Sequence, residues 1–148
     1  MRVKDLSELL SMWKEDCKID DMNFDDESLR SPVLHSKYID IMSEHNLYLK
    51  RLEKDFRQLK RIMWQYYRGE LNNPEDLKKH GLPPMQYKIL KAEVVTWLES
   101  DNELAEFQLK IDHQKEIVDT CKSIISAISN RRWDIRNAIE WRKFINGE

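Results

Sequence analysis

The sequence predicts an all-α protein built on two long antiparallel helices. Charged residues make up 35% of the chain and hydrophobic residues 41%, and the 148 residues include 3 glycines, a composition typical of long solvated helices. Two segments carry apolar residues at alternating spacings of three and four, which is the heptad pattern of helices that pack against each other. The length fits about one domain.

The first expected helix lies near residues 3–17, where apolar residues recur every three or four positions. The segment 15–27 follows, with seven acidic residues and one lysine, and we expect a mobile acidic connector there. Ser31 and Pro32 suit the cap and the first position of the next helix.

The second expected helix carries a heptad seam and ends near Gly69. Only His45 is polar among its nine seam positions, and His45 is expected to be a core polar residue rather than a metal ligand. A seam this regular needs a partner helix. The nine positions are Tyr38, Met42, His45, Leu49, Leu52, Phe56, Leu59, Met63 and Tyr66.

A short turn and a third helix are expected next. Asn73 and Pro74 begin the turn, Gly81 ends it, and two prolines then favour a loop. The third helix is predicted over about residues 85–99. Its inward-facing side chains are expected to be Leu90, Val94, Trp97 and Leu98.

The fourth helix is predicted to begin at a capping box made by Ser100 and Glu103. A second heptad seam follows, a bend is expected at Ser129-Asn130, and a final helix should cover about residues 131–145. The second seam consists of Leu104, Phe107, Ile111, Gln114, Val118, Cys121, Ile125 and Ile128.

A basic and aromatic stripe lies opposite the first seam. Residues 48–68 hold seven basic and two acidic residues, a local charge of +5 in a chain of net charge −2. Cations in a row suit the phosphates of a nucleic acid, and flat side chains between them suit unpaired bases. The candidate single-strand contacts are Lys50, Lys54, Arg57, Arg61, Trp64 and Arg68, flanked by Lys60 and Tyr67.

Other interpretations of this stripe stay open at the level of sequence. It fits a solvated helix face on a coiled-coil adaptor protein that does not bind DNA. A membrane-surface helix is disfavoured, because the aromatic residues of such a helix form a separate apolar face, whereas Trp64 and Tyr67 alternate with the cations here. Measuring how salt affects binding to oligo-dT separates the adaptor from the DNA-binding protein.

The C-terminal segment 130–144 is apolar on more than one side. Such a helix is usually buried between neighbours, so it belongs either to an intramolecular core or to a subunit interface. The candidate oligomerisation residues are Ile125, Ile128, Ile135, Ile139, Trp141 and Phe144.

Several functional classes lack their sequence signatures. There is no phosphate-binding GxxxxGK[ST] motif, no HExxH or ExxH spacing among the four histidines, and no nucleophile beside a base. We therefore expect no enzyme, no metal and no cofactor. Two isolated cysteines favour a reducing cytoplasm, and neither a signal peptide nor a membrane-spanning run is expected.

The chain resembles the UvsY family of recombination mediators from T-even-type phages. The resemblance rests on the order and spacing of "MRVKDL", "LHSKYI", "LKRIMWQYYRGE", "KAEVV" and "WRKFINGE". It implies a homo-oligomeric ring of six or seven subunits that binds single-stranded DNA. It also implies contact with a RecA-like phage recombinase, which the mediator loads in place of the phage single-strand-binding protein, in the cytoplasm of the bacterial host.

The resemblance also places functional residues. In the family a basic motif precedes a pair of tyrosines, which match Tyr66-Tyr67 here. One cation of the motif then falls on Arg61. The other falls on Met63, which is a departure from the family pattern, and Lys60, Arg57 or Arg68 supplies the missing charge. We expect residues 1–100 to contain the acidic connector and the DNA-binding helix, and residues 101–148 to form the helical oligomerisation region.

Overall fold

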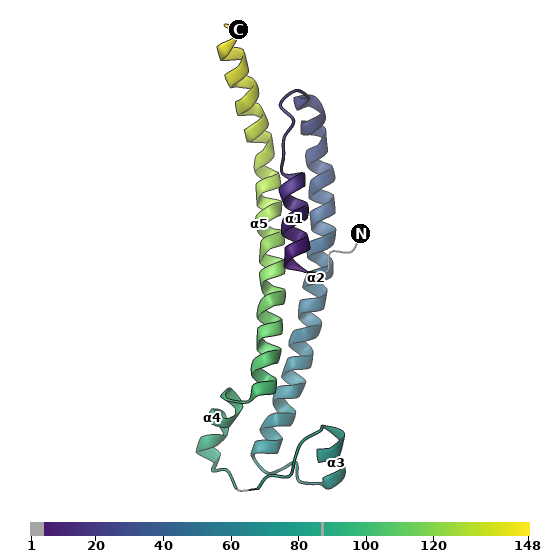
Figure 1. Cartoon of the computed structure of the whole chain (residues 1–148), viewed down its shortest axis with the longest axis vertical. Helices are drawn as coiled ribbons and strands as arrows, with labels where there is room; N and C mark the ends of the chain where they lie inside the picture. The colour runs from purple at the N-terminus through teal and green to yellow at the C-terminus, as the bar shows by residue number, and fades with distance from the viewer. Residues whose placement is uncertain (1–4, 87) are drawn as a thin grey trace. The chain divides into compact units, whose positions relative to one another are not determined.

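The structure is a computed structural model that describes residues 5–86 and 88–148. Its helices are α1 (Leu6–Asp16), α2 (Phe24–Tyr67), α3 (Pro74–Lys79), the 3-10 helix η1 (Lys91–Glu93), α4 (Val94–Glu99) and α5 (Asn102–Ile145) (Figure 1). No strand occurs in the part of the chain that is described, so the predicted all-α class is confirmed. The first two residues of the helix expected near 3–17 lie outside the described residues.

The chain divides into two compact units. Unit 1 joins the chain up to Tyr48 to the segment Gln114–Glu148, and unit 2 is the continuous segment Leu49–His113. Each unit therefore contains part of both long helices. The predicted division into a DNA-binding region (1–100) and an oligomerisation region (101–148) concerns function rather than packing, and it stays a prediction.

Unit 1 is a packed arrangement of α1 with parts of α2 and α5. Its buried centre includes Leu9, Tyr38 and Cys121, each of which is 0% exposed. The two polar seam residues of this unit bond to each other, because the Gln114 side-chain amide lies 3.0 Å from Nδ1 of His45 and donates to the His45 carbonyl at 2.8 Å. His45 is thus a polar residue within the seam, as expected.

Unit 2 has its own apolar core, formed where the end of α2 meets α3, α4 and the start of α5. Met63, Leu77 and Leu98 are among its buried residues. Asp101 fastens two of these elements, because its side chain accepts from the Leu104 amide at 2.9 Å at the start of α5 and from the Tyr67 hydroxyl at 2.5 Å.

The two heptad seams are confirmed by burial. In α2 the seam residues are buried or partly buried along the whole helix, and Leu52 is 4% exposed. In α5 the matching residues Ile111 and Val118 are each 3% exposed. Within unit 1, residue 27 bonds to residue 131 and residue 45 to residue 114, so the helices run antiparallel there.

The acidic connector is shorter than predicted. α2 begins at Phe24, so the acidic residues 25–27 form its first turn and Pro32 lies inside the helix. The predicted cap at Ser31 is therefore wrong. Acidic residues suit the N-terminal end of a helix because they interact favourably with its dipole, and Glu27 in addition forms an ion pair with Arg131 at 2.7 Å.

Three further boundaries differ from the expectation. Residues 85–86 and 88–90 are not helical, and Leu90 is 64% exposed rather than inward-facing. Asp101, not Ser100, caps α5, since the Ser100 hydroxyl donates back to the Thr96 carbonyl at 2.9 Å. There is no separate final helix after Ser129, because α5 runs without interruption from Asn102 to Ile145.

None of the described helices combines the length and the apolar character needed to cross a membrane. Among residues 5–86 and 88–148 there is also no group of three histidine, cysteine or acidic side chains placed to hold a metal ion.

Candidate nucleic-acid interface

The basic stripe occupies one continuous outer face of α2 in unit 2. Lys50, Lys54, Arg57 and Arg61 are all exposed, and cations at spacings of three and four recur about every 5 to 6 Å along a helix. Within the described residues none of these four side chains, nor that of Lys60, forms an ion pair. Their charges are therefore available to an external anion.

Trp64 and Arg68 form a pair at the end of this stripe. Trp64 is 39% exposed, and the Arg68 guanidinium carbon lies 4.3 Å from the centroid of its ring. Arg68 also lies 3.5 Å from a carboxylate oxygen of Glu70. Arg68 is thus already engaged by an aromatic ring and a carboxylate, unlike the free cations that precede it.

Tyr67 is held by the packing of unit 2. Its hydroxyl donates to Asp101, and its ring lies 5.3 Å from that of Tyr66 and 5.9 Å from that of Trp97. Burial and the Asp101 carboxylate both raise the pKa of the Tyr67 hydroxyl above its usual range. A nucleobase that stacked on Tyr67 would have to compete with these contacts.

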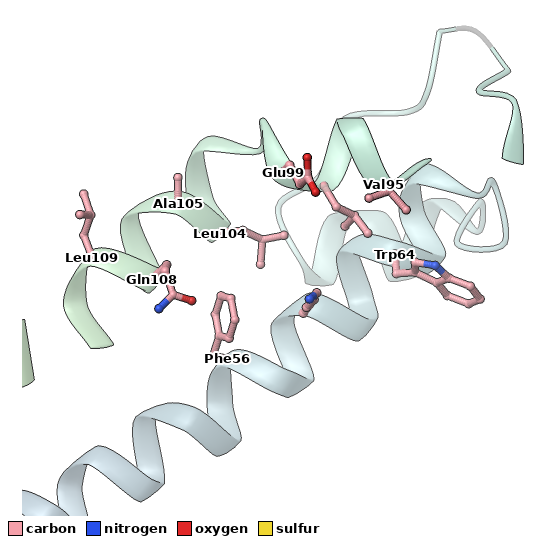
Figure 2. Close-up of a pocket in the computed structure, with 10 residues that line it drawn as sticks. Phe56, Trp64, Val95, Glu99, Leu104, Ala105, Gln108 and Leu109 are labelled. Atoms are coloured by element: carbon pink, nitrogen blue, oxygen red, sulfur yellow. The ribbon is translucent and has the colours of Figure 1, made fainter. Parts of the chain in front are cut away.

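An apolar groove borders the stripe. It has a volume of about 760 Å³ and is lined by Phe56, Lys60 and Trp64 of α2, by residues of α4 that include Val95, and by residues of α5 that include Leu109. Figure 2 shows these elements around the groove. Lys60 and Trp64 belong to both the stripe and the groove, so the two features share an edge.

Sequence reasoning missed the groove. Val95 and Leu109 carry no signal of their own, because each lies on the polar side of its local helical pattern. In the structure both side chains are exposed, at 59% and 67% respectively. Their meaning depends on the packing of α4 and α5 beside α2, which makes them part of the same groove as Trp64.

The candidate oligomerisation residues fall into two groups. Ile128 and Ile135 are 3% and 4% exposed and are therefore buried within the chain itself. Ile125 packs against the unit 1 core, and Ile139 is partly buried. Only Trp141 and Phe144 present large exposed surfaces, at 62% and 73%, with their rings stacked 5.6 Å apart.

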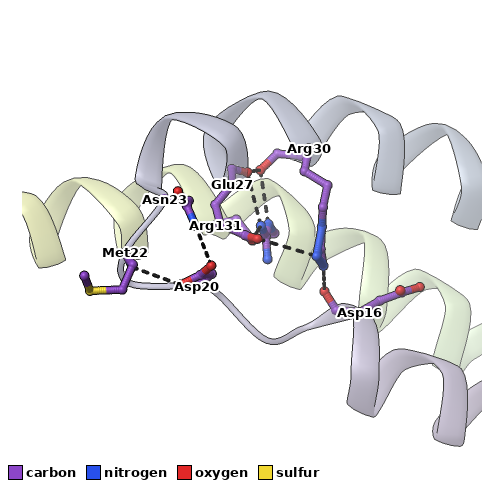
Figure 3. A network of polar contacts seen from close by, with 8 residues as sticks. Asp16, Asp20, Met22, Asn23, Glu27, Arg30 and Arg131 are labelled. Atoms are coloured by element: carbon purple, nitrogen blue, oxygen red, sulfur yellow. Dashed lines mark hydrogen bonds and ion pairs between the residues drawn. The ribbon is translucent and has the colours of Figure 1, made fainter.

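Arg131 lies in α5 close to two other arginines, Arg132 and Arg136, and it serves the structure of unit 1. It is 3% exposed, bonds the Glu27 carboxylate at 2.7 Å through Nη2, and donates from Nε to the Ser31 hydroxyl at 3.1 Å (Figure 3). Arg30 extends this network by approaching Glu27 at 3.6 Å and donating to the Asp16 carbonyl. Arg131 is therefore unavailable to a strand.

The neighbouring Arg132 and Arg136 are exposed. Their guanidinium carbons lie 5.1 Å and 5.8 Å from the ring centroid of Trp133. This second basic and aromatic group is smaller than the stripe on α2, and the exposed Asp134 lies within it. The α2 stripe thus offers the longer run of unpaired cations.

Comparison with known proteins identifies the family of this chain. The family described as "Recombination, repair and ssDNA binding protein UvsY" matches residues 12–148. The chain belongs to the UvsY family. A search of curated proteins finds no match.

Solved UvsY structures share the fold. A crystal structure of the bacteriophage T4 recombination mediator protein UvsY, lattice type II, superposes with a TM-score of 0.81 at 20% identity, over 97% of this chain and 99% of that chain. The type I lattice gives a TM-score of 0.80, also at 20% identity, over 93% and 98% of the two chains. The UvsY fold is therefore retained over nearly the whole chain despite extensive sequence divergence.

Proposed function

We propose that this UvsY-family chain is a non-catalytic recombination mediator. It binds single-stranded DNA as a homo-oligomeric ring of six or seven subunits and promotes loading of a RecA-like phage recombinase in place of the phage single-strand-binding protein. The observation that carries the DNA-binding step is the run of exposed, unpaired cations on α2. Family membership supports the role in recombination.

The lack of acidic partners along the stripe supports this site. Some basic residues of unit 1, such as Lys37 and Arg131, do form ion pairs with acidic partners, at 2.6 Å and 2.7 Å. The stripe residues Lys50, Lys54 and Arg61 have no such partners within the described residues. A face that served solubility alone has no need to exclude acids, whereas a phosphate-binding face does, because nearby carboxylates repel phosphates.

The first experiment measures oligo-dT affinity at several salt concentrations for the parent and for Arg61→Ala. Removing one phosphate contact per subunit should reduce the slope of log affinity against log salt by about 0.7 for each subunit that the strand contacts. Lys115→Ala is the matched control, because it removes one exposed cation that belongs to α5 in unit 1 and is not part of the stripe. We expect the control to keep the parent slope.

A contrary result has a defined meaning. If Arg61→Ala and the combined Arg57→Ala/Arg61→Ala variant both bind with the parent's affinity and slope, the stripe is a solvated face. If the parent itself does not bind oligo-dT, the non-catalytic coiled-coil adaptor is the better function. Circular dichroism should match the parent in every variant, since these positions are exposed.

The ring interface is expected to use the exposed end of α5, where Trp141 and Phe144 are uncovered. A truncation after Ser129 would not test this, because it removes Arg131 and Ile135, which are buried in unit 1. Trp141→Ala/Phe144→Ala keeps those residues. Sedimentation should give smaller species than the parent, and an unchanged mass would place the interface elsewhere.

The mediator role is tested with the partners present. The chain should shorten the lag before a RecA-like recombinase assembles on DNA already covered by single-strand-binding protein. Arg61→Ala should lengthen that lag more than Lys115→Ala does. Equal lags for parent and buffer would reject the loading step while leaving DNA binding intact.

A further inference from the structure

The groove beside the stripe joins two features that are usually separate on a soluble protein. Val95 and Leu109 leave apolar surface open, at 59% and 67% exposure, and Lys60 and Trp64 form the opposite edge. Large exposed apolar patches usually mark a binding surface. Here the apolar surface lies next to unpaired cations, so a ligand that covers it should be charged along one edge and apolar along the other.

The arrangement around α2 separates these two properties in space. At about 100° per residue, Lys60 lies between the buried seam and the outer stripe, Trp64 lies within about 20° of Arg57 on the stripe itself, and Arg61 lies farther out. A strand whose phosphates contact Arg57 and Lys60 therefore has its other edge toward the groove. A single strand has this character, because its bases present flat apolar faces that stack on aromatic side chains.

The wall of the groove formed by α4 and α5 disfavours contact with the phosphates of the strand. It carries the Glu99 carboxylate, and Gln108 is its other polar group on that side. A phosphate drawn toward this wall would meet a negative charge, whereas a base is uncharged. The charges thus favour one orientation, with phosphates on the α2 edge and bases inside.

We propose that the groove formed by α2, α4 and α5 of unit 2 receives the bases of a single strand whose phosphates lie along Lys60 and Arg57. This inference rests on the proposed function, since it needs the strand to follow the stripe. It assigns Val95 and Leu109 as base contacts on the α4 and α5 side of the groove, with Trp64 on the α2 side. It also predicts that the protein distinguishes a strand with bases from a bare phosphate backbone.

The test compares Leu109→Asn with Leu47→Asn. Both leucines are exposed on helices, at 67% and 65%, but Leu47 lies in unit 1 and does not line the groove. Affinities are measured for oligo-dT and for an abasic strand of the same length, over a series of salt concentrations. The abasic strand keeps the phosphates and removes the bases.

The parent should bind oligo-dT at least tenfold more tightly than the abasic strand, because the abasic strand has no bases to stack in the groove. Leu109→Asn should lower the oligo-dT affinity several-fold, leave the abasic affinity unchanged and keep the salt slope. Leu47→Asn should behave as the parent. The mass of the oligomer should be the same for all three proteins.

Three outcomes overturn the inference. The first is equal binding of oligo-dT by Leu109→Asn and the parent, and the second is equal binding of oligo-dT and the abasic strand by the parent. In both of these, the proposed function survives if oligo-dT still binds with a steep salt slope. The third is a changed oligomer mass for Leu109→Asn, which would make the groove a subunit interface.

Discussion

The ion pair between Glu27 and Arg131 offers a quantitative test of how unit 1 is held together. The Arg131 side chain is 3% exposed and that of Glu27 is 10% exposed. Removing one partner of such a pair leaves an uncompensated buried charge, which costs about 3–5 kcal/mol. We expect the two single substitutions to differ, because the groups left behind have different remaining partners.

Arg131→Met should cost about 3 kcal/mol, at the low end of that range, because Arg30 remains 3.6 Å from the Glu27 carboxylate. Glu27→Met should cost about 4–5 kcal/mol. It leaves the guanidinium with neutral acceptors only, the Ser31 hydroxyl at 3.1 Å and the carbonyl of residue 27 at 3.2 Å. The double variant should lie within about 1 kcal/mol of the parent, since a buried pair can be replaced by apolar groups with little loss of stability.

Urea unfolding followed by circular dichroism measures these differences. With a slope of about 2 kcal/mol per molar urea, Arg131→Met should shift the midpoint by about 1.5 M and Glu27→Met by about 2–2.5 M. Protein concentration must be fixed, because an oligomer gains stability from association. A double variant as unstable as the worse single variant would refute the reasoning, as would single variants that each cost less than about 1 kcal/mol.

Three further predictions concern stability and reactivity. Burial alone would raise the pKa of Asp16, but hydrogen bonds from Lys37 and Tyr38 outweigh it and hold the pKa below the usual value. In acid-unfolding curves, the parent should therefore be more stable than Asp16→Asn by the full amount above about pH 5, and the difference should shrink as the pH falls below about 4. Burial raises the pKa of the Cys121 thiol to about 11, whereas Cys17 is exposed. A thiol reagent at about pH 8 should therefore modify one cysteine in the native chain and both cysteines in urea. Fast modification of both cysteines in the native chain would show that unit 1 opens readily. Asp101→Ala should cost about 1–2 kcal/mol in urea unfolding through loss of the α5 cap, and a variant as stable as the parent would show that the Leu104 amide finds another acceptor.

The long helices could be predicted from sequence because their signal is carried by many residues. A spacing of three and four reports the side of a helix that meets a partner, and both seams are buried as expected, from Tyr38 to Tyr66 and from Leu104 to Ile128. The predicted pairing of the two helices follows from the same pattern.

The helix ends depended on single residues and were harder to predict. Pro32 looks like a start signal, yet α2 begins at Phe24. Pro32 leaves the Ser28 carbonyl without its usual helical donor, but both residues are exposed, so water can satisfy that carbonyl. The additional turns are held by the Glu27–Arg131 contact, which joins positions 104 residues apart and has no local signal.

The candidate site was predicted in part for the same reasons. A row of cations on one side of α2 is a local property, and the exposed faces of Lys50, Lys54, Arg57 and Arg61 follow from it. The groove depends on three separate segments, so its residues on α4 and α5 could not be chosen from local pattern. Only the packing of unit 2 brings those segments together.

The interleaving of the two units along the chain has a consequence for the order in which the protein folds. Unit 2 is one continuous segment, and its Tyr67–Asp101 bond joins residues 34 positions apart. Unit 1 requires the 104-residue closure between Glu27 and Arg131, which costs about 1 kcal/mol more in chain entropy when made directly. Unit 2 should therefore form first, before the C-terminal quarter of the chain has packed into unit 1. Once it has formed, both long helices already have a folded turn from which to elongate, so the nucleation step that limits isolated helices is avoided for unit 1.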